Sequence, residues 1–267
     1  MAWIKRVGFG LVCLYLGLLA VLYVVQRDIQ YPLDPVRLDP KEAGVLAAEE
    51  ITLQLDDGTV VIAWRAQSRK GKPTILYFHG NAGSLQHRAH RFVEFTNAGY
   101  GLMALSYPGY GGSQGTPSEK SIMEAAFLAY DQLRIEGIQP DRIVIYGNSL
   151  GSGVSVQVAS QRLVGGLILE AAYFSIVDVV QDNFPVFPIA LLLKDQFRSD
   201  LWAGKISSPT LMIHGRQDRT IPHISGEKLS RMIRSLTRFV SIENGGHNNL
   251  WELGARQEIA TFLSERE

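Results

Sequence analysis

The hydrophobic positions divide the chain into an apolar N-terminal segment and a longer remainder in which short apolar runs alternate with amphipathic stretches. Residues Val7–Val25 form an unbroken run of nineteen uncharged residues. In a helix that rises about 1.5 Å per residue, this run matches the ~30 Å hydrocarbon core of a bilayer. Trp3 and Tyr23 lie near its ends, where aromatic side chains favour the membrane interface. The pattern predicts an N-terminal transmembrane anchor within residues 1–30.

A cleaved signal peptide is the alternative for this segment. The run exceeds the usual apolar length of such peptides, and no small-x-small cleavage pattern follows it, so an uncleaved anchor is favoured. Lys5 and Arg6 precede the run and Arg27 and Arg37 follow it. The small excess of positive charge before the run favours an inner N-terminus and an extracytoplasmic position for residues 31–267. Cys13 is expected to face lipid.

The remainder begins with a predicted hairpin and continues with buried strands. Ile51–Leu55 and Thr59–Arg65 flank Asp57-Gly58, a strong hairpin-turn pair. The apolar runs that follow are too short for helices and are typical of strands buried on both faces. They are Thr74–Phe78, Gly101–Ser106, Arg142–Tyr146, Gly166–Leu169, Thr210–Ile213 and Arg238–Ile242.

Helical stretches separate these runs, at 84–98, 117–136, 150–162, 223–236 and 248–264. For the helix at 117–136, we expect Thr116 as the N-cap residue, Pro117 at the first helical position and Glu119 closing a capping box. Alternation of strand and helix predicts an α/β fold with a mostly parallel sheet covered by helices on both faces. No linker or repeat interrupts residues 31–267, so they are expected to form one domain. Such sheets carry their sites at the carboxyl ends of the strands.

Composition excludes several classes of function. The chain is 46% hydrophobic and 19% charged, which fits a packed globular domain. Its 26 basic and 26 acidic residues cancel, and no basic run is present, so no electrostatic feature favours nucleic acid as a partner. The single cysteine cannot form an internal disulfide or a cysteine metal site. We therefore expect no metal and no nucleic-acid partner.

One strand end carries a candidate nucleophile. In Gly147-x-Ser149-x-Gly151 a strand runs directly into a helix, which is typical of the sharp turn that raises a serine hydroxyl above a sheet. The segment Gly111-Gly-Ser113-Gln-Gly115 has the same spacing, but Ser113 follows a glycine-rich loop and no helix starts directly after it. A phosphate-binding turn is the other alternative, and no P-loop lysine supports it. Context selects Ser149.

A serine nucleophile needs a base, and the chain offers six histidines. His87 and His90 lie on a predicted helix and are expected at the surface, and His223 is expected to be exposed at a helix start. His79 and His214 each end a buried strand, where a loop hydrogen bond is the usual role. His247 lies in Asn-Gly-Gly-His-Asn, a flexible loop between the last strand and the last helix, from which a base can reach over the sheet edge. His247 is the predicted base.

The histidine in turn needs an acid that orients it and stabilises its charged form. Asp218 follows the strand Thr210–Ile213, and the order Ser149, Asp218, His247 suits this architecture. Glu170, at the end of the preceding strand, is the rival acid. For the oxyanion we expect two backbone N–H donors, from Asn81 in the loop His79–Gly83 and from Leu150 beside the nucleophile.

These motifs together resemble the α/β-hydrolase superfamily, specifically its small membrane-linked serine hydrolases. The family patterns H-G-N-A-G, G-N-S-L-G, H-G-x-x-D-x-x-x-P and G-G-H-N are similar to His79–Gly83, Gly147–Gly151, His214–Pro222 and Gly245–Asn248, in that order. A fifth likeness is Tyr107-Pro-Gly-Tyr-Gly, where relatives often have arginine at the second position. The resemblance covers about residues 50–267. It implies a catalytic triad without metal or organic cofactor, on a substrate class that ranges from esters and acyl-protein thioesters to peptides.

The resemblance also implies a short cap over the nucleophile, in the insertion at residues 172–207. This insertion contains Phe174, Val177, Phe184, Phe187 and the run Ile189–Leu193, which would either favour an acyl or aromatic group or complete the core. We therefore expect a membrane-anchored hydrolase of small carboxylic esters or thioesters, which the bilayer itself could hold. An amidase or peptidase with the same triad, and a non-catalytic binding protein on this fold, are the alternatives. Nothing in the sequence indicates an oligomeric state.

Overall fold

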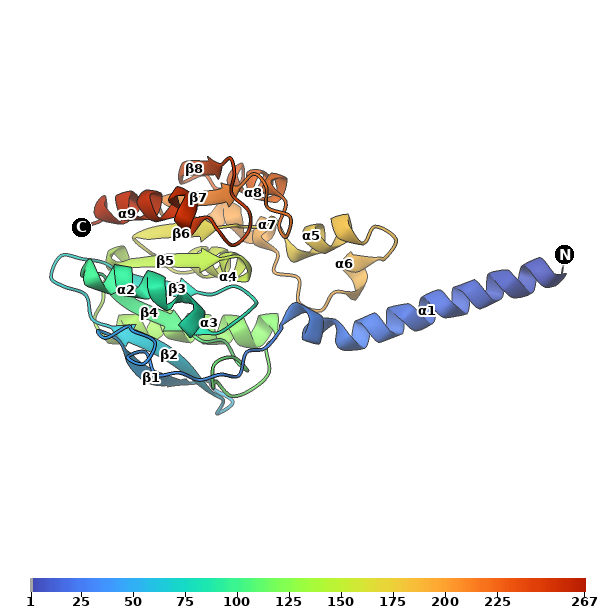
Figure 1. The fold of residues 1–267 in the computed structure, drawn as a ribbon, viewed down its shortest axis with the longest axis horizontal. Helices are drawn as coiled ribbons and strands as arrows, with labels where there is room; N and C mark the ends of the chain where they lie inside the picture. The colour runs from blue at the N-terminus through green and yellow to red at the C-terminus, as the bar shows by residue number, and fades with distance from the viewer. Residues whose placement is uncertain (1) are drawn as a thin grey trace.

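The computed structural model describes residues 2–267 and contains an eight-stranded sheet from which one long helix, α1 (Ala2–Gln30), projects (Figure 1). The strand order is β1-β2-β4-β3-β5-β6-β7-β8. The strands are β1 (Glu49–Gln54), β2 (Val60–Ala66), β3 (Thr74–Phe78), β4 (Gly101–Leu105), β5 (Ile143–Asn148), β6 (Gly166–Glu170), β7 (Thr210–Gly215) and β8 (Leu236–Ile242). Strands β1 and β2 pair antiparallel, β2 pairs antiparallel with β4, and every later pairing is parallel. The predicted α/β fold is confirmed.

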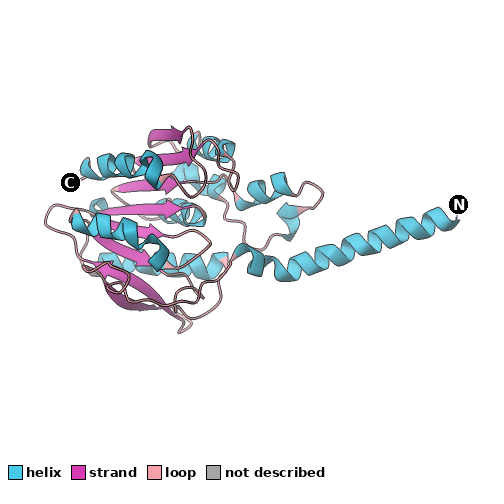
Figure 2. Ribbon diagram, viewed as in Figure 1, coloured by secondary structure: helices cyan, strands magenta, loops and turns pink. Residues whose placement is uncertain are grey.

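Helices cover both faces of the sheet (Figure 2). They are α2 (Ala89–Asn97), α3 (Glu119–Ile135), α4 (Leu150–Ala159), α5 (Ile176–Asn183), α6 (Ile189–Leu192), α7 (Ser199–Trp202), α8 (His223–Ser230) and α9 (Arg256–Ser264). Successive side chains of a strand point to opposite faces. In β3, Leu76 and Phe78 therefore join the core formed with α3 and α4, whereas Ile75 and Tyr77 join the core formed with α2 and α9. This double burial explains why the central strands appear in the sequence as continuous apolar runs.

The capping of α3 differs from the prediction. Its N-cap is Ser118 rather than Thr116, and the Ser118 hydroxyl accepts the backbone N–H of Ser121. The Glu119 carboxylate does not close a capping box, because it accepts the backbone N–H groups of Gln196 and Phe197 instead. A tertiary contact with the chain around Asp195 thus replaces the local contact that the sequence suggested.

Two helix boundaries also differ. Helix α8 ends at Ser230 rather than at residue 236, and a turn segment at 231–235 connects it to the edge strand β8, which begins at Leu236. The predicted helix 248–264 is divided into a π-helical turn, η4 (Trp251–Ala255), and α9. The break lies at Gly254, which has a φ of 118° that side-chain-bearing residues rarely adopt.

Glycines allow the tight junction between β5 and α4. A Cβ on Gly147 would lie 2.2 Å from the carbonyl oxygen of Gly151, and a Cβ on Gly151 would lie 2.0 Å from that of Phe78. Both glycines are therefore required by backbone contact, since the first turn of α4 sits directly against the end of β5 at Gly147 and against the end of β3 at Gly151. This contact sets the position of the residue between them, Ser149.

We predict that Gly151→Ala destabilises the protein, because its methyl group would meet the Phe78 carbonyl and force the backbone apart. The free energy of unfolding should fall by about 1–3 kcal/mol or more. In the matched control, Gly204→Ala, the nearest atom to the new Cβ is 4.0 Å away, and a change below about 0.5 kcal/mol is expected. Chemical denaturation of the two purified variants and the wild-type protein measures both changes in stability. Equal stability of the two variants would contradict this account of the junction.

Candidate active site

The candidate nucleophile Ser149 lies on a strained turn between β5 and α4. Its backbone has a φ of 53° and a ψ of −119°, a conformation that costs a non-glycine residue roughly 1–3 kcal/mol. Its N–H donates to the carbonyl oxygen of Glu170 on the neighbouring strand at 2.9 Å. The register that pairs Asn148 with Glu170 provides this bond, so the β5–β6 ladder continues past the end of the strand and holds the turn.

The structure brings Ser149, His247 and Asp218 together in one hydrogen-bonded chain. The Nε2 atom of His247 lies 2.9 Å from the Ser149 hydroxyl, and its Nδ1 atom lies 2.7 Å from Asp218 Oδ2. His247 comes from the loop after β8 and Asp218 from the loop after β7. If Nδ1 carries the proton and donates it to the carboxylate, Nε2 is free to accept the hydroxyl proton of Ser149. This is the arrangement required for a general base beside a nucleophile.

Asp218 is held in its charged form. Burial raises the pKa of its carboxyl group, but hydrogen bonds from His214 and His247 lower it more, and the net pKa is well below its ordinary value. The other carboxylate oxygen accepts the backbone N–H groups of Thr220 at 2.8 Å and Ile221 at 2.9 Å. The carboxylate is therefore ionised at neutral pH, and both of its oxygens accept hydrogen bonds.

Sequence analysis missed the contribution of His214. Its Nε2 atom lies 3.4 Å from Asp218 Oδ2 and 3.0 Å from the carbonyl oxygen of Ile221. His214 thus supports the acid at the same carboxylate oxygen that contacts His247. The available signal was its position at the end of β7, four residues before Asp218, which lies in the loop that follows this strand.

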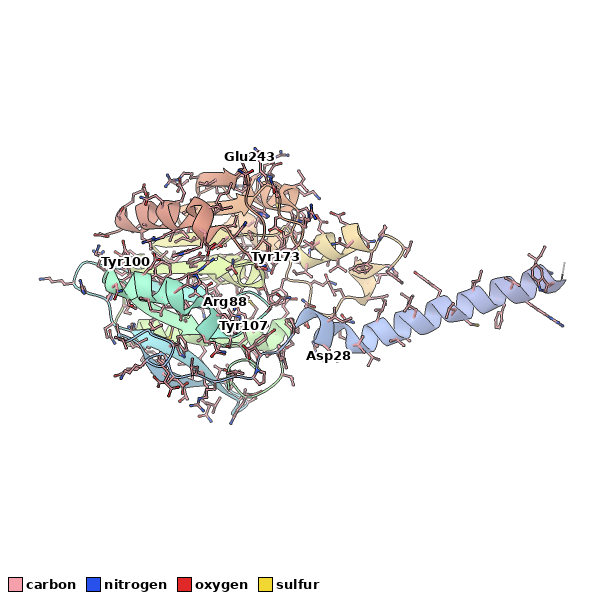
Figure 3. The ribbon with its side chains drawn as sticks, viewed as in Figure 1. Asp28, Arg88, Tyr100, Tyr107, Tyr173 and Glu243 are labelled. Atoms are coloured by element: carbon pink, nitrogen blue, oxygen red, sulfur yellow. The ribbon has the colours of Figure 1, made fainter. Side chains whose placement is uncertain are left out.

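The loop His79–Gly83 lies directly beside the nucleophile. A Cβ on Gly80 would be 3.3 Å from Ser149 Cβ. The loop's carbonyl groups are held away from the site, because the Tyr107 hydroxyl donates to His79 at 3.0 Å and the Tyr110 hydroxyl to Asn81 at 2.7 Å (Figure 3 labels Tyr107). Burial, together with the nearby charge of Arg88, lowers the pKa of His79 to about 3, so this histidine is neutral.

Two backbone donors are free at this position. Within residues 2–267, no group accepts a hydrogen bond from the N–H groups of Asn81 and Leu150. Leu150 begins α4, and N–H groups in the first turn of a helix have no partner within it. The arrangement can therefore supply two N–H donors to an anionic oxygen on a substrate bound at Ser149.

Glu170 has a different environment from Asp218. Its carboxylate is buried, forms a two-point ion pair with Arg91 and accepts the hydroxyl of Tyr146. Burial raises the pKa of this carboxyl group and the Arg91 charge lowers it, with a net pKa below its ordinary value. No hydrogen bond joins Glu170 to His247 among the described residues, which leaves Asp218 as the acid in contact with the base.

The remaining candidates lie outside this constellation. The Ser113 hydroxyl accepts the N–H of Ile62 at 2.9 Å and donates to Ser106 at 3.0 Å, a structural role in a buried loop. His87 and His90 are exposed, as predicted. His223 is not exposed as predicted, because it packs beside Phe239 with its Nε2 atom 2.9 Å from the Ser241 hydroxyl. Among residues 2–267, no group of three or more metal-ligating side chains is placed to hold a metal ion.

Comparison with known proteins relates this chain to hydrolases. Residues 73–190 match the alpha/beta hydrolase fold family. An uncharacterised protein of Mycobacterium tuberculosis is 30% identical over 258 residues, which cover 93% of this chain and 91% of that protein.

Solved structures share the fold at lower identity. An esterase of Pyrococcus furiosus superimposes with a TM-score of 0.69 at 14% identity, over 88% of this chain and 96% of that one. A membrane phospholipase A, described as a bacterial virulence factor, gives a TM-score of 0.62 at 19% identity, over 98% and 99% of the two chains. At these identities the likeness shows the fold alone. Together with the family match and the M. tuberculosis relative, it establishes that this chain belongs to the alpha/beta hydrolase family.

Proposed function

We propose that this hydrolase cleaves carboxylic esters or thioesters through an acyl-enzyme on Ser149. The observation that carries the proposal is the hydrogen-bonded chain from the Ser149 hydroxyl through His247 to Asp218, with Ser149 on a strained turn beside two free N–H donors. A non-catalytic binding protein would have no need of this combination. The aligned base, the ionised acid and the free donors favour catalysis instead.

In the proposed mechanism, His247 Nε2 takes the hydroxyl proton as Ser149 Oγ attacks the acyl carbon. The carbonyl oxygen becomes negatively charged and is stabilised by the N–H groups of Asn81 and Leu150. His247 then gives its proton to the departing alcohol or thiol, and the acyl group stays on Ser149. Water, deprotonated by the same histidine, attacks the acyl-enzyme and releases the carboxylic acid. Asp218 stabilises the positive charge that His247 carries in each half-reaction.

The choice between ester, thioester and amide is a question of the leaving group. A panel of acyl esters of graded length, acyl thioesters and aminoacyl amides tests it directly. We expect esters or thioesters to be the better substrates. Preferential cleavage of the amides would identify an amidase or peptidase with the same triad.

We also propose that α1 anchors the chain in a membrane and that residues 31–267 form the catalytic domain, with its cap at residues 172–207. The most apolar 18-residue stretch within Trp3–Gln30 has a mean hydropathy of 2.4, and none of its residues is buried. Large apolar side chains such as Trp3, Phe9 and Leu14 are more than 70% exposed. This exposure fits a bilayer as the surrounding medium. The charge bias at its ends favours an extracytoplasmic catalytic domain.

For the nucleophile, we predict that a fluorophosphonate probe labels Ser149 covalently. Ser149→Ala should abolish labelling, because Ser149 combines a histidine contact with a strained turn beside two free N–H donors. Ser241, whose hydroxyl lies 2.9 Å from His223, is instead a residue of strand β8. Ser113→Ala is the control and should remain labelled. Gel fluorescence and peptide mapping measure both results. Labelling that survives in the Ser149 variant would falsify the assignment.

For the acid, we predict that Asp218→Asn slows turnover by up to about 10⁴-fold while the fold is kept, since the variant cannot stabilise the charged histidine. Glu170→Gln should act on stability instead, because it removes the buried charge opposite Arg91, at a cost of up to about 3–5 kcal/mol. Turnover measured well below the unfolding temperature, together with thermal melts, separates the two effects. The reverse pattern would assign the acid role to Glu170.

For the anchor, we predict that deletion of residues 1–24 gives a protein that needs no detergent and still cleaves a small soluble ester. The cut leaves Gln26, Arg27 and Gln30 in place. Deletion of residues 1–28 should also abolish the need for detergent, but at lower stability, because the buried Asp195 carboxylate loses its Arg27 partner. Membrane fractionation and N-terminal sequencing of the full-length product are the measurements. A mature N-terminus after Val25 would identify a signal peptide instead.

A further inference from the structure

The apolar end of the cap lies along α1 (Figure 1). We call residues 184–193, Phe-Pro-Val-Phe-Pro-Ile-Ala-Leu-Leu-Leu, the cap tip. The Tyr15 hydroxyl donates to the carbonyl oxygen of Val186 at 2.8 Å, and the Tyr15 ring stacks on Phe187 with centroids 6.0 Å apart. Farther along the helix, the Gln26 amide donates to the carbonyl of Leu192 at 3.2 Å. The cap tip therefore follows α1 from Tyr15 to Gln26, about 16 Å of helix.

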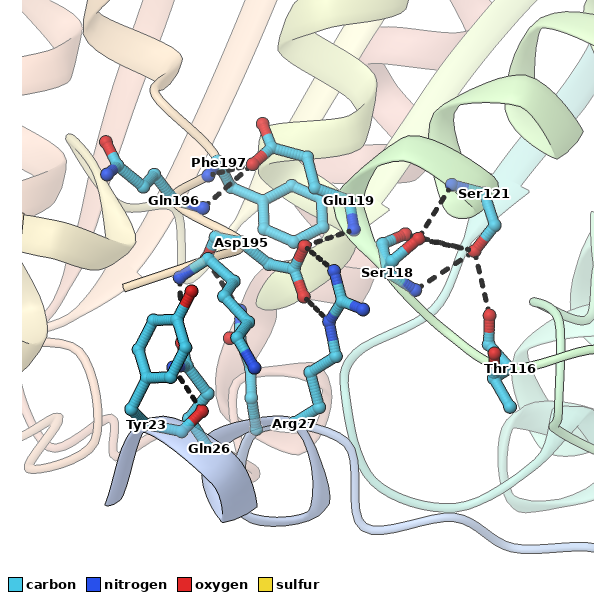
Figure 4. Close-up of polar contacts among 12 residues, drawn as sticks. Tyr23, Gln26, Arg27, Thr116, Ser118, Glu119, Ser121, Asp195, Gln196 and Phe197 are labelled. Atoms are coloured by element: carbon cyan, nitrogen blue, oxygen red, sulfur yellow. Dashed lines mark hydrogen bonds and ion pairs between the residues drawn. The ribbon is translucent and has the colours of Figure 1, made fainter. Parts of the chain in front are cut away.

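A polar clamp holds α1 and the cap in this arrangement (Figure 4). The Arg27 guanidinium forms a two-point ion pair with Asp195, at 2.7 and 3.1 Å. The same carboxylate accepts the backbone N–H of Glu119 at 3.0 Å, which ties the clamp to the start of α3. Gln30 adds a hydrogen bond to the Asp195 carbonyl at 3.0 Å. The direction of the helix is thus set relative to the catalytic domain.

The outer side of the cap tip is apolar and exposed. Phe184, Val186 and Leu191 are 53%, 71% and 84% exposed, and the segment contains no charged residue. The sequence left open whether these side chains complete the core. The cap side chains do not complete the core, because the two cap helices α5 and α6 contain no buried residue. In water, a patch of this kind next to an equally exposed apolar helix would be unfavourable.

Most backbone polar groups of the cap tip also have partners within the protein, an arrangement that suits a membrane. An unpaired polar backbone group in hydrocarbon costs several kcal/mol, so irregular chain there needs internal partners. Two residues of the segment are prolines, which have no N–H. The carbonyl groups of Phe184 and Phe187 accept the Gln181 side-chain amide, and that of Val186 accepts the Tyr15 hydroxyl. The Gln196 amide donates to Ala190 and Leu193. A loop facing only water would not need these partners, because water supplies them.

We propose that the cap tip is embedded in the lipid bilayer beside α1, and that the enzyme takes acyl-ester lipids from that membrane. The proposal rests on the serine-hydrolase function above. If Val7–Val25 spans the hydrocarbon, Tyr15 lies near its middle, and the cap residues that contact Tyr15 lie at the same depth. The bilayer covers the apolar surface that the protein leaves exposed.

The active site adjoins the same end of α1. The side-chain amide of Asn81 donates to the carbonyl oxygen of Gln30, the last residue of the helix, at 3.2 Å. Asn81 belongs to the loop that provides an N–H donor for the oxyanion in the proposed mechanism. The site is therefore held next to the point where α1 leaves the domain, at the membrane surface, where the acyl-ester linkage of a lipid also lies.

The depth of the cap tip in the bilayer is tested with a fluorescent probe in the full-length protein. Cys13 is the single cysteine, so Cys13→Ala with Leu191→Cys gives one site for an environment-sensitive nitrobenzoxadiazole label. The control, Leu163→Cys, labels a residue that is 70% exposed before the amino end of β6, away from α1. In phosphatidylcholine vesicles, lipids brominated on their acyl chains should quench the label at 191 and leave the label at 163 unaffected. Equal and weak quenching at both positions would overturn the embedding.

The substrate class is tested with charge substitutions on the same exposed surface. Leu191→Asp should reduce hydrolysis of a fluorescent acyl-ester lipid in vesicles by about tenfold or more, because a carboxylate opposes insertion. Hydrolysis of a soluble short-chain ester should stay within about twofold, since residue 191 is outside the catalytic chain. Leu163→Asp should change neither rate. Wild-type enzyme that cleaves the soluble ester but not the vesicle lipid would overturn the lipid substrate. Wild-type enzyme that cleaves neither and takes up no fluorophosphonate would instead overturn the proposed function.

Discussion

The contact between the first turn of α4 and the end of β3 is the constraint on which the site depends. It requires glycine at position 151, and the contact of the same helical turn with the end of β5 requires glycine at position 147. Between them Ser149 is left at a positive φ that the hydrogen bond to Glu170 helps to maintain. Because the turn is set by backbone contacts, the Ser149 hydroxyl has one position above the sheet. His247 and Asp218 come from loops after the two strands at the edge of the sheet, and their hydrogen bonds meet the hydroxyl at that position.

Two buried side-chain contacts support this geometry. Arg91 and Glu170 form an ion pair, and the backbone of Glu170 accepts the N–H of Ser149 directly. His214 lies beside the Asp218 oxygen that also contacts His247. A further contact, the ion pair between Arg27 and Asp195, connects α1, the proposed membrane anchor, to the cap.

The sequence predicted the fold because hydrophobic periodicity and turn residues act locally. The hairpin at Asp57-Gly58 and the buried strands lie where expected, and the strand ends led to Ser149, Asp218 and His247, whose catalytic roles stay predictions. Contacts between distant residues could not be predicted. Tyr15 and Val186 are 171 positions apart, and the Glu119 carboxylate leaves its local cap for Gln196 and Phe197. No local pattern distinguishes such partners, which only the assembled sheet and cap bring together.

The covalent intermediate is the central claim of this account, and rapid-quench mass spectrometry of the full-length enzyme with an activated aryl ester tests it most directly. The leaving group should appear in a burst of one equivalent per enzyme, and the acyl group should be found on the peptide that contains Ser149. An acyl group on any other residue, or steady turnover of the aryl ester with neither a burst nor a modified peptide, would contradict it.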